Sequence, residues 1–403
     1  MKKLFVFSIF VLAFLLYGIF LSLYQFKIVV PEINSKNPPG YYDYRGVTNV
    51  HSNASTGSAG YSDVLQYAKN SKLDWIILTE VNLPSRPEFI EGYFQDMLVL
   101  TGGEYSYFDS RLLYYGARNN DEPPAGQSQT QVFFADILSQ SQRPQNDFIV
   151  LAHPYYSRYN WKNDYPIGLN GVEVINLKSV LDKTWKEAKT RTLMSLVLYS
   201  FNPSMAFLSI YSNPEDELAL WDQLNKKQKI VGFAGNDTTA RVPISDEKYL
   251  KFPSYETSFG LLSNHVLLNT ELTGDYKKDK QKIFKALRDG QFYMSLDFLG
   301  SPKGFYVEIR DGEKDYPLGS EVILKKDLKL IIELPQGMKA PFQITIKKDG
   351  ENYSSSTSLK TVLNISTPGA YRIEVRVNPK LPIPRGNRWV PWIYTNNIIV
   401  KEN

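Results

Sequence analysis

The sequence predicts an α/β barrel followed by a small all-β domain, with a transmembrane helix in front of both. This prediction rests on three features of the chain. An unbroken apolar run occupies the N-terminus, short apolar runs then alternate with helical patterns, and strand-like runs without helices follow residue 300. Strands that alternate with helices are typical of a parallel sheet, closed or nearly closed as a barrel.

The composition limits the possible functions. The chain has 403 residues, of which 43% are hydrophobic and 22% charged, and this suits a large folded domain plus a smaller one. The net charge of +4 is too small, and Lys and Arg are too evenly spread, to predict nucleic-acid binding. There is no Cys, and His51, His153 and His265 are the only histidines. A disulfide framework, a thiolate site and a His-rich trinuclear centre are therefore excluded.

Residues 1–27 predict a membrane anchor. Lys2 and Lys3 precede an uncharged apolar run from Leu4 to Tyr24. At roughly 1.5 Å per residue this run crosses a hydrocarbon core about 30 Å thick. The basic end should stay cytoplasmic, which places the rest of the chain outside a cytoplasmic membrane that it crosses once. A cleaved signal peptide is the alternative, and it would leave a secreted protein.

Residues 28–43 contain Pro38-Pro39-Gly40 and predict an extended linker, and residues 44–300 predict the barrel domain. The expected strands are 47–50, 75–78, 97–100, 112–115, 148–151, 172–175 and 230–234. The expected helices are 62–71, 130–139, 184–199, 215–225 and 279–288.

Residues 301–403 predict a β-sandwich of the immunoglobulin-like kind. Turn dipeptides such as Asp311-Gly312 and Asp349-Gly350 separate short runs of alternating polarity. The expected strands are 305–309, 328–334, 342–347, 371–377 and 393–400.

Polar residues stand at the predicted C-terminal ends of the barrel strands. Asn49 and His51 end the first strand, and Glu104, His153 and Asp237 end later ones. Because strand ends converge in a barrel, and active sites assemble there, we expect these side chains to share one site.

Several of these segments resemble a known family. The run Arg45–Asn82, with GVTNVHSNAS and KLDWIILTEVN, resembles the opening of PHP (polymerase and histidinol phosphatase) domains. The resemblance continues in order with Gly103-Glu104, Leu151–Pro154 and Gly235–Thr239, and it covers residues 44–300. The later segments resemble a PHP branch with a C-terminal β-domain, similar to carbaryl hydrolases. The resemblance to this family implies a distorted TIM-like (β/α)7 barrel and the activity of a metal-dependent hydrolase.

The resemblance also implies a metal site that is only partly kept. Asn49 stands where the family's first His belongs, and His51 keeps the second. Glu104 matches a carboxylate that bridges two metals, His153 matches the His of Leu-Ala-His-Pro, and Asp237 matches a late Asp. The family's other positions hold residues that do not bind metals, namely Val81, Arg111 and Thr239.

One cation site would therefore keep His51, Glu104 and Asp237, with an amide oxygen from Asn49, and a second would keep only Glu104 and His153. An imidazole with two carboxylates and an amide oxygen suits Zn, Mn or Fe, in declining order. We expect one divalent cation, and at most two. Arg111 or Arg158 would stabilise negative charge on the substrate.

The sequence thus predicts a membrane-anchored, extracytoplasmic hydrolase. It would use a metal-activated water on a small-molecule ester, with phosphoesters as the first choice. The alternative is a catalytically degenerate barrel that binds an envelope ligand or partner. The oligomeric state and the identity of the substrate do not follow from the sequence.

Overall fold

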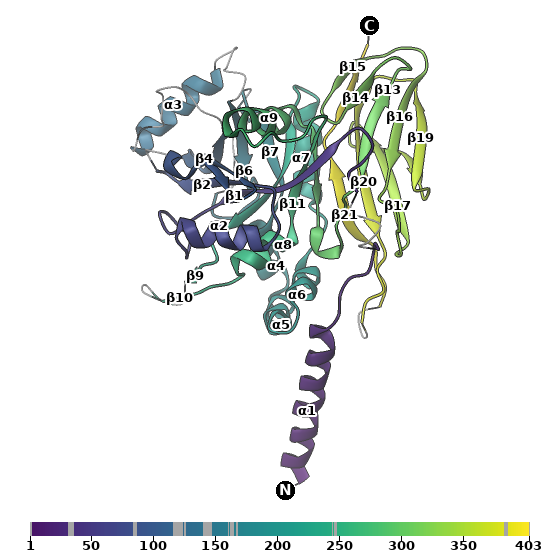
Figure 1. The fold of residues 1–403 in the computed structure, drawn as a ribbon. Helices are drawn as coiled ribbons and strands as arrows, with labels where there is room; N and C mark the ends of the chain where they lie inside the picture. The colour runs from purple at the N-terminus through teal and green to yellow at the C-terminus, as the bar shows by residue number, and fades with distance from the viewer. Residues whose placement is uncertain are drawn as a thin grey trace.

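The computed structural model describes residues 2–30, 36–83, 87–115, 124, 126–139, 147–159, 161, 165–166, 168–243, 245, 248–382 and 386–402. Residues 31–35 of the predicted linker lie outside this description. The chain forms an N-terminal helix, a barrel and an all-β domain (Figure 1). Helix α1 (Lys2–Ser22) projects away from the rest, and among the described residues it is the one helix long and apolar enough to span a membrane.

Seven strands close the predicted barrel. In order around it they are β1 (Tyr42–Val50), β2 (Trp75–Val81), β4 (Met97–Tyr107), β5 (Ser110–Tyr115), β6 (Phe148–Ala152), β7 (Gly171–Asn176) and β8 (Val231–Thr238). Strand β8 returns to pair with β1, with Thr48 opposite Gly235 and Val50 opposite Thr238. Neighbouring strands are parallel, except that β5 runs antiparallel to both β4 and β6.

The regular (β/α)7 alternation predicted for the barrel is wrong. Strands β4 and β5 form a hairpin, and antiparallel strands joined by a tight turn need no crossover helix. Between β2 and β4 the described residues form only the 3-10 turn η1 (Glu88–Ile90) and strand β3 (Gly92–Phe94).

Helices cover the remaining connections unevenly. Helix α2 (Tyr61–Asn70) follows β1, and α3 (Gln127–Ser139) follows β5. Four helices lie between β7 and β8: α4 (Leu177–Glu187), α5 (Lys189–Tyr199), α6 (Pro203–Ile210) and α7 (Glu215–Asn225). The single helix expected over 184–199 is thus split at Ala188, whose φ of −150° is not helical.

One hydrogen-bonded sheet continues from the barrel into the C-terminal domain. The first half of β1 pairs with β11 (Ser263–Leu268), β11 pairs with β12 (Phe292–Ser295), and β12 pairs with β21 (Val390–Thr395). Strands β9 (Val242–Pro243) and β10 (Tyr249–Leu250) and helix α8 (Tyr255–Leu261) lie between β8 and β11 in the chain. Helix α9 (Tyr276–Asp289) lies between β11 and β12, and the 3-10 turn η2 (Asp297–Leu299) follows β12.

The C-terminal domain is all-β, as predicted, and has two sheets. One sheet continues that of the barrel and contains β15 (Glu321–Ile323), β17 (Phe342–Lys348), β18 (Glu351–Ser356), β20 (Gly369–Val377), β21 and β22 (Ile398–Lys401). The other contains β13 (Tyr306–Arg310), β14 (Asp315–Pro317), β16 (Leu328–Glu333) and β19 (Lys360–Ile365).

Large apolar side chains fill the half of the barrel where its parallel strands begin. Trp75, Leu98, Phe148 and Phe233 lie at or near the starts of their strands and are almost fully buried. The rings of Phe148 and Phe233 stack with their centroids 6.0 Å apart. This part of the barrel is therefore a packed apolar core, and the expected site lies at the other end, where the parallel strands end.

A buried cluster of charged groups lies where the barrel meets the C-terminal domain. Nδ1 of His265 lies 2.8 Å from Asp43, and Nε2 lies 3.2 Å from Asp297. Tyr293 stacks on the imidazole and donates a hydrogen bond to Asp43, while Arg45 pairs with Asp297. Burial alone would lower the pKa of His265, but the charges of Asp43 and Asp297 outweigh it and raise the pKa to about 9.

This cluster makes stability depend on pH. Because the folded pKa of His265 is above its unfolded value, its contribution is complete below about pH 6.5 and is lost as the pH rises through about 9. The loss is on the order of 3 kcal/mol. We expect the Tm of the full chain in detergent to fall over this window, and to fall less in His265→Gln. Equal pH slopes for the two proteins would contradict this assignment.

Candidate metal centre

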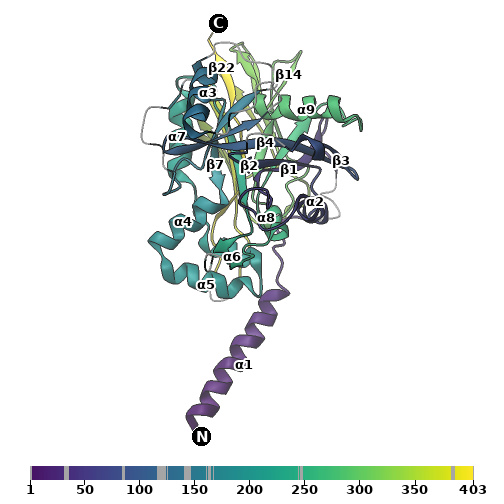
Figure 2. The same cartoon turned by 90° about the vertical axis from the view of Figure 1, so that its left-hand side faces the viewer.

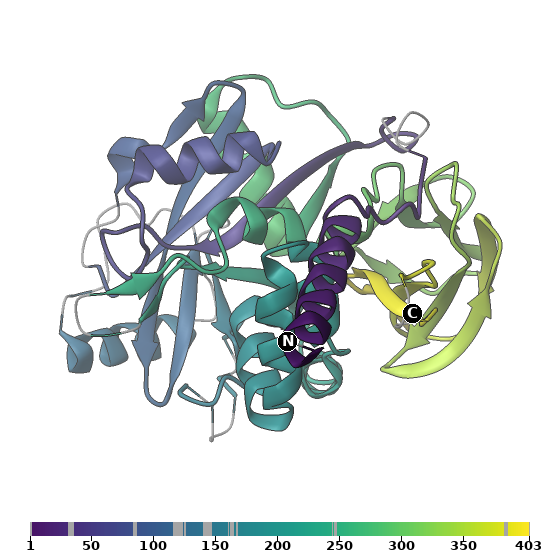
Figure 3. The same ribbon diagram turned by 90° about the horizontal axis from the view of Figure 1, so that it is seen from below.

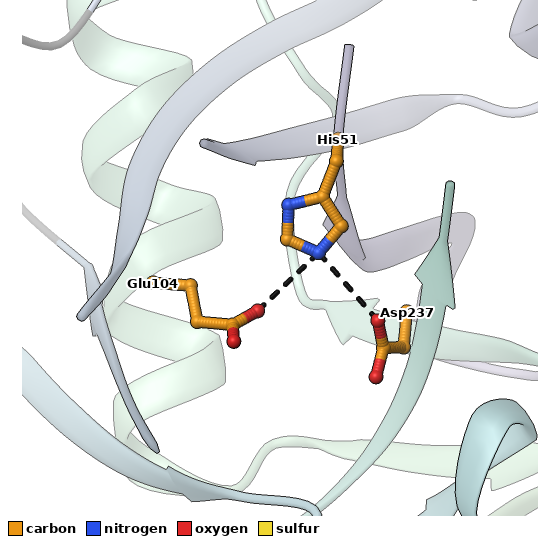
Figure 4. A group of neighbouring side chains, drawn as sticks. All are labelled: His51, Glu104 and Asp237. Atoms are coloured by element: carbon orange, nitrogen blue, oxygen red, sulfur yellow. Dashed lines mark ion pairs between the residues drawn. The ribbon is translucent and has the colours of Figure 1, made fainter. Parts of the chain in front are cut away.

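Side chains from three strands of the barrel meet at its C-terminal end (Figure 4). His51 follows β1, Glu104 lies in β4 and Asp237 lies in β8. Nε2 of His51 lies 3.3 Å from Glu104 Oε2 and 3.6 Å from Asp237 Oδ1. The three residues are buried, and one ligand atom of each lies within 4.8 Å of the other two. The residues predicted for one cation site are therefore neighbours in the fold.

Closure of the barrel holds this group in place. The backbone N–H of His51 donates to the carbonyl of Thr238 over 3.0 Å, and the hydroxyl of Tyr255 donates to the carbonyl of His51 over 2.7 Å. Asn49, His153 and Asp237 all have positive φ, at 59°, 31° and 45°. Such backbone conformations are uncommon outside glycine and gather at functional sites, where the surrounding structure imposes them.

The donor atoms fit a small divalent cation. Ligands bound tetrahedrally at about 2.0–2.2 Å lie roughly 3.3–3.6 Å from one another. The separations from His51 to Glu104 and to Asp237 fall in this range. Nδ1 of His51 and both ring nitrogens of His153 are also buried without a hydrogen-bond partner in the described part of the chain. A nitrogen with two carboxylates suits Zn, Mn or Fe.

Mutual pairing sets the charges of this group. Burial opposes ionisation of Glu104, but His153 and His51 hold its pKa well below the usual range. Burial also opposes ionisation of Asp237, whose pKa is lowered by the charge of Lys178 and by His51. Burial would lower the pKa of His51, yet Asp237 and Glu104 raise it to about 9. A bound cation would therefore replace a proton on His51.

Two fixed cations border the group. Nζ of Lys178 lies 3.1 Å from Asp237 Oδ1, and Nε of Arg111 lies 3.8 Å from Glu104 Oε1. The Arg111 guanidinium lies 4.4 Å from the centre of the Tyr159 ring. Its Nε and Nη1 are buried and have no hydrogen-bond partner among the described residues. Arg111 therefore has unused donors at the site, as a group that binds an anion requires.

The sequence argument missed Lys178 and Glu173. Lys178 follows the end of β7 by two residues, so the strand-end rule that identified the other residues also applies to it. Glu173 is a buried acid within the apolar strand β7. A charged residue within an apolar run was the feature of the sequence that could have identified it. It accepts hydrogen bonds from Asn49 Nδ2 and from the backbone N–H of His153, each over 2.9 Å. Burial raises the pKa of Glu173 to about 7.

The remaining predicted residues lie at different distances from the group. Nε2 of His153 lies 3.6 Å from Glu104 Oε1, next to the group and in reach of the same carboxylate. Asn49 lies in the wall of the site, where its amide nitrogen binds Glu173 and its oxygen accepts from Thr79 over 3.4 Å. Arg158 is exposed on the loop after β6. The role of each as a ligand or a catalytic group stays a prediction.

Comparison with known proteins shows a distant likeness to a solved structure. No family model matches the chain, and no curated protein matches it. The fold is similar to the solved structure of a two-domain protein from Bacteroides vulgatus that contains a predicted PHP-like metal-dependent phosphoesterase. The match covers 89% of this chain and 98% of that chain, with 12% identity and a TM-score of 0.40. At this low similarity, only the residues of this chain indicate its function.

Replacement of Lys178 tests whether its ammonium group competes with a cation for Asp237. Lys178→Met removes a positive charge from the site, so we expect Zn²⁺ and Mn²⁺ to bind more tightly, on the order of tenfold. Isothermal titration of the full chain would measure this change. Lys183→Met is the matched control, because Lys183 lies on the same helix and pairs with the exposed Asp216. Unchanged or weaker metal binding by Lys178→Met would show that the ammonium group does not compete.

Proposed function

We propose that the protein is a membrane-anchored, extracytoplasmic hydrolase that uses one divalent cation to cleave a small-molecule ester. Phosphoesters are the first choice of substrate. The observation that carries the proposal is the buried group of His51, Glu104 and Asp237 beside Arg111, whose Nε and Nη1 have no hydrogen-bond partner among the described residues. The mostly exposed apolar helix α1 supports the anchor.

The cation would be held by Nε2 of His51 and by the carboxylates of Glu104 and Asp237. When bound there, it would lower the pKa of a water molecule and polarise the scissile ester. His153 lies beside Glu104 and would complete a second, weaker cation position. Glu173 holds the backbone of His153, and thereby fixes where that imidazole stands.

The cationic side chains would bind the substrate. The guanidinium of Arg111 is planar, always charged and stacked on Tyr159, so its N–H groups are held in place and would donate to a phosphoryl oxygen of the substrate. Donors fixed in this way stabilise negative charge that develops during ester cleavage. Arg158 is exposed beyond the site, and would meet the solvent-facing part of an anionic substrate.

A second function is favoured by the two ion pairs at the site. Lys178 and Arg111 already place a positive charge near Asp237 and Glu104. These side chains supply positive charge to the two buried carboxylates without a bound metal ion. The barrel would then be catalytically degenerate, and would bind an anionic envelope ligand or a partner.

Metal content separates the two functions. We expect the full chain, purified in detergent without chelator, to carry one equivalent of Zn, Mn or Fe by mass spectrometry. His51→Ala should lose that metal together with hydrolysis of phosphomonoesters or phosphodiesters, because it removes the nitrogen ligand. A metal-free protein that hydrolyses neither substrate under added Zn²⁺ or Mn²⁺ would favour the degenerate barrel.

Arg111 provides a test of substrate binding that leaves the metal ligands intact. We expect Arg111→Ala to keep the metal and to lower kcat/KM roughly a hundredfold, the usual cost of removing a fixed donor to a developing charge. Arg111→Lys should recover only part of this loss, because lysine lacks the planar fork. Arg158→Ala is the control and should have a much smaller effect. An Arg111→Ala protein that keeps both its metal and an unchanged kcat/KM would refute this role.

A further inference from the structure

After its first turn, helix α5 presents apolar side chains to the outside and two small polar ones to the inside. Thr192 and Ser195 are buried, and the Ser195 hydroxyl donates to the carbonyl of Ala206 over 2.8 Å. The outer face carries four exposed apolar side chains: Leu193 (52% exposed), Met194 (60%), Leu196 (38%) and Val197 (44%). A surface helix of a water-soluble domain has the opposite arrangement. An apolar patch of this kind marks a surface that contacts something other than water.

This patch lies at the point where α1 leaves the domain. Phe201 and Asn202 lie in the short connection between α5 and α6. The ring of Phe201 meets the ring of Phe14 edge-on, with centroids 5.6 Å apart, and packs against Gly18, where an added Cβ would lie 2.3 Å from it. Asn202 Nδ2 donates to the carbonyl of Leu21 over 2.8 Å. The corner between α5 and α6 is therefore fastened to the second half of α1.

The contact between Phe201 and Phe14 also determines how far along α1 the α5–α6 connection lies. Phe14 precedes Ser22, the last residue of α1, by eight residues, or about 12 Å at 1.5 Å per residue. The 21 residues of α1 span about 30 Å, the thickness of the hydrocarbon core. If the bilayer covers α1, it therefore also covers Phe201.

The direction of α5 suits a helix that lies in a membrane surface. In Figure 2, α5 lies at the end of the molecule from which α1 projects, and it runs across the direction of α1. Figure 3 looks along α1 from its N-terminus and shows it between the teal helices of this region and the C-terminal domain. A helix placed in this way lies flat on a bilayer that α1 crosses.

The residues next to the apolar face are those that a membrane interface favours. Trp185, near the end of α4, is 46% exposed, and tryptophan is enriched at the level of lipid headgroups. Lys189 and Arg191, in the first turn of α5, are exposed and carry the positive charge that attracts anionic lipids.

We propose that α5 is a second membrane-inserting element, an in-plane helix whose Leu193, Met194, Leu196 and Val197 lie in the outer leaflet beside α1. This inference rests on the part of the proposed function that makes α1 a membrane anchor, and it is independent of catalysis. A single tether leaves the barrel free to tilt, whereas α1 and α5 together fix its orientation. Helix α4 carries Lys178 at the site and Trp185 near the surface, seven residues or about 10 Å apart. The site therefore stands at a constant height above the lipid.

Single cysteines test this proposal directly, because the natural chain has none. Leu193→Cys and Val197→Cys would be labelled with an environment-sensitive fluorophore in the full chain, reconstituted in nanodiscs of phosphatidylethanolamine and phosphatidylglycerol. Phe10→Cys in α1 is the lipid-exposed reference. Val362→Cys in β19 is the matched control, because Val362 is 52% exposed and lies in the C-terminal domain.

We expect both α5 labels to be quenched by doxyl lipids as strongly as the Phe10 label, and to be shielded from aqueous iodide, with the Val362 label showing the reverse. Quenching of the α5 labels by iodide, as at Val362, would overturn the proposal. Shielding from both quenchers would also overturn it, because the patch would then be covered by protein. If the Phe10 label itself is open to iodide, the anchor fails, and this result is distinct from a failure of α5 alone.

Discussion

The return of β8 to β1 is the contact on which the candidate site depends. Their parallel pairing closes the barrel and places Asp237 beside His51, although 186 residues separate them in the chain. Apolar side chains pack the interior near the N-terminal ends of the parallel strands, so the candidate site lies at their C-terminal ends. The same strand β1 pairs through its first half with β11 and so connects the barrel to the C-terminal sheet. A change that opened this pairing would disturb both the site and the junction between the domains.

Closure has an electrostatic consequence, because it buries two carboxylates a few ångströms apart. Glu104 and Asp237 need positive charge nearby, and the chain supplies it from His51, Lys178 and Arg111. A divalent cation would supply the same charge more compactly, with release of the His51 proton. In the proposed hydrolase a bound divalent cation supplies the positive charge at this site. In the alternative binding protein the charged side chains alone supply it.

Much of this arrangement could be predicted from sequence. Strand-end reasoning identified His51, Glu104 and Asp237, since local apolar runs predict strands and parallel strand ends converge. It missed Lys178, although Lys178 also follows a strand end, and it missed Glu173 because the role of Glu173 depends on contact with the distant Asn49. The β4–β5 hairpin and the break at Ala188 were missed because no Gly or Pro marks either place. The outward-facing apolar side chains of α5 could not be predicted from the sequence, because packing against α6 determines which face of α5 is buried.

Anomalous diffraction from crystals grown with Zn²⁺ tests the central claim most directly, because it locates the cation without reference to activity. We expect one strong peak within bonding distance of His51 Nε2 and of the carboxylates of Glu104 and Asp237, with a weaker second peak at most, beside His153. Absence of a peak at this group, with Lys178 still paired to Asp237, would contradict the metal centre and leave the barrel with fixed charges only.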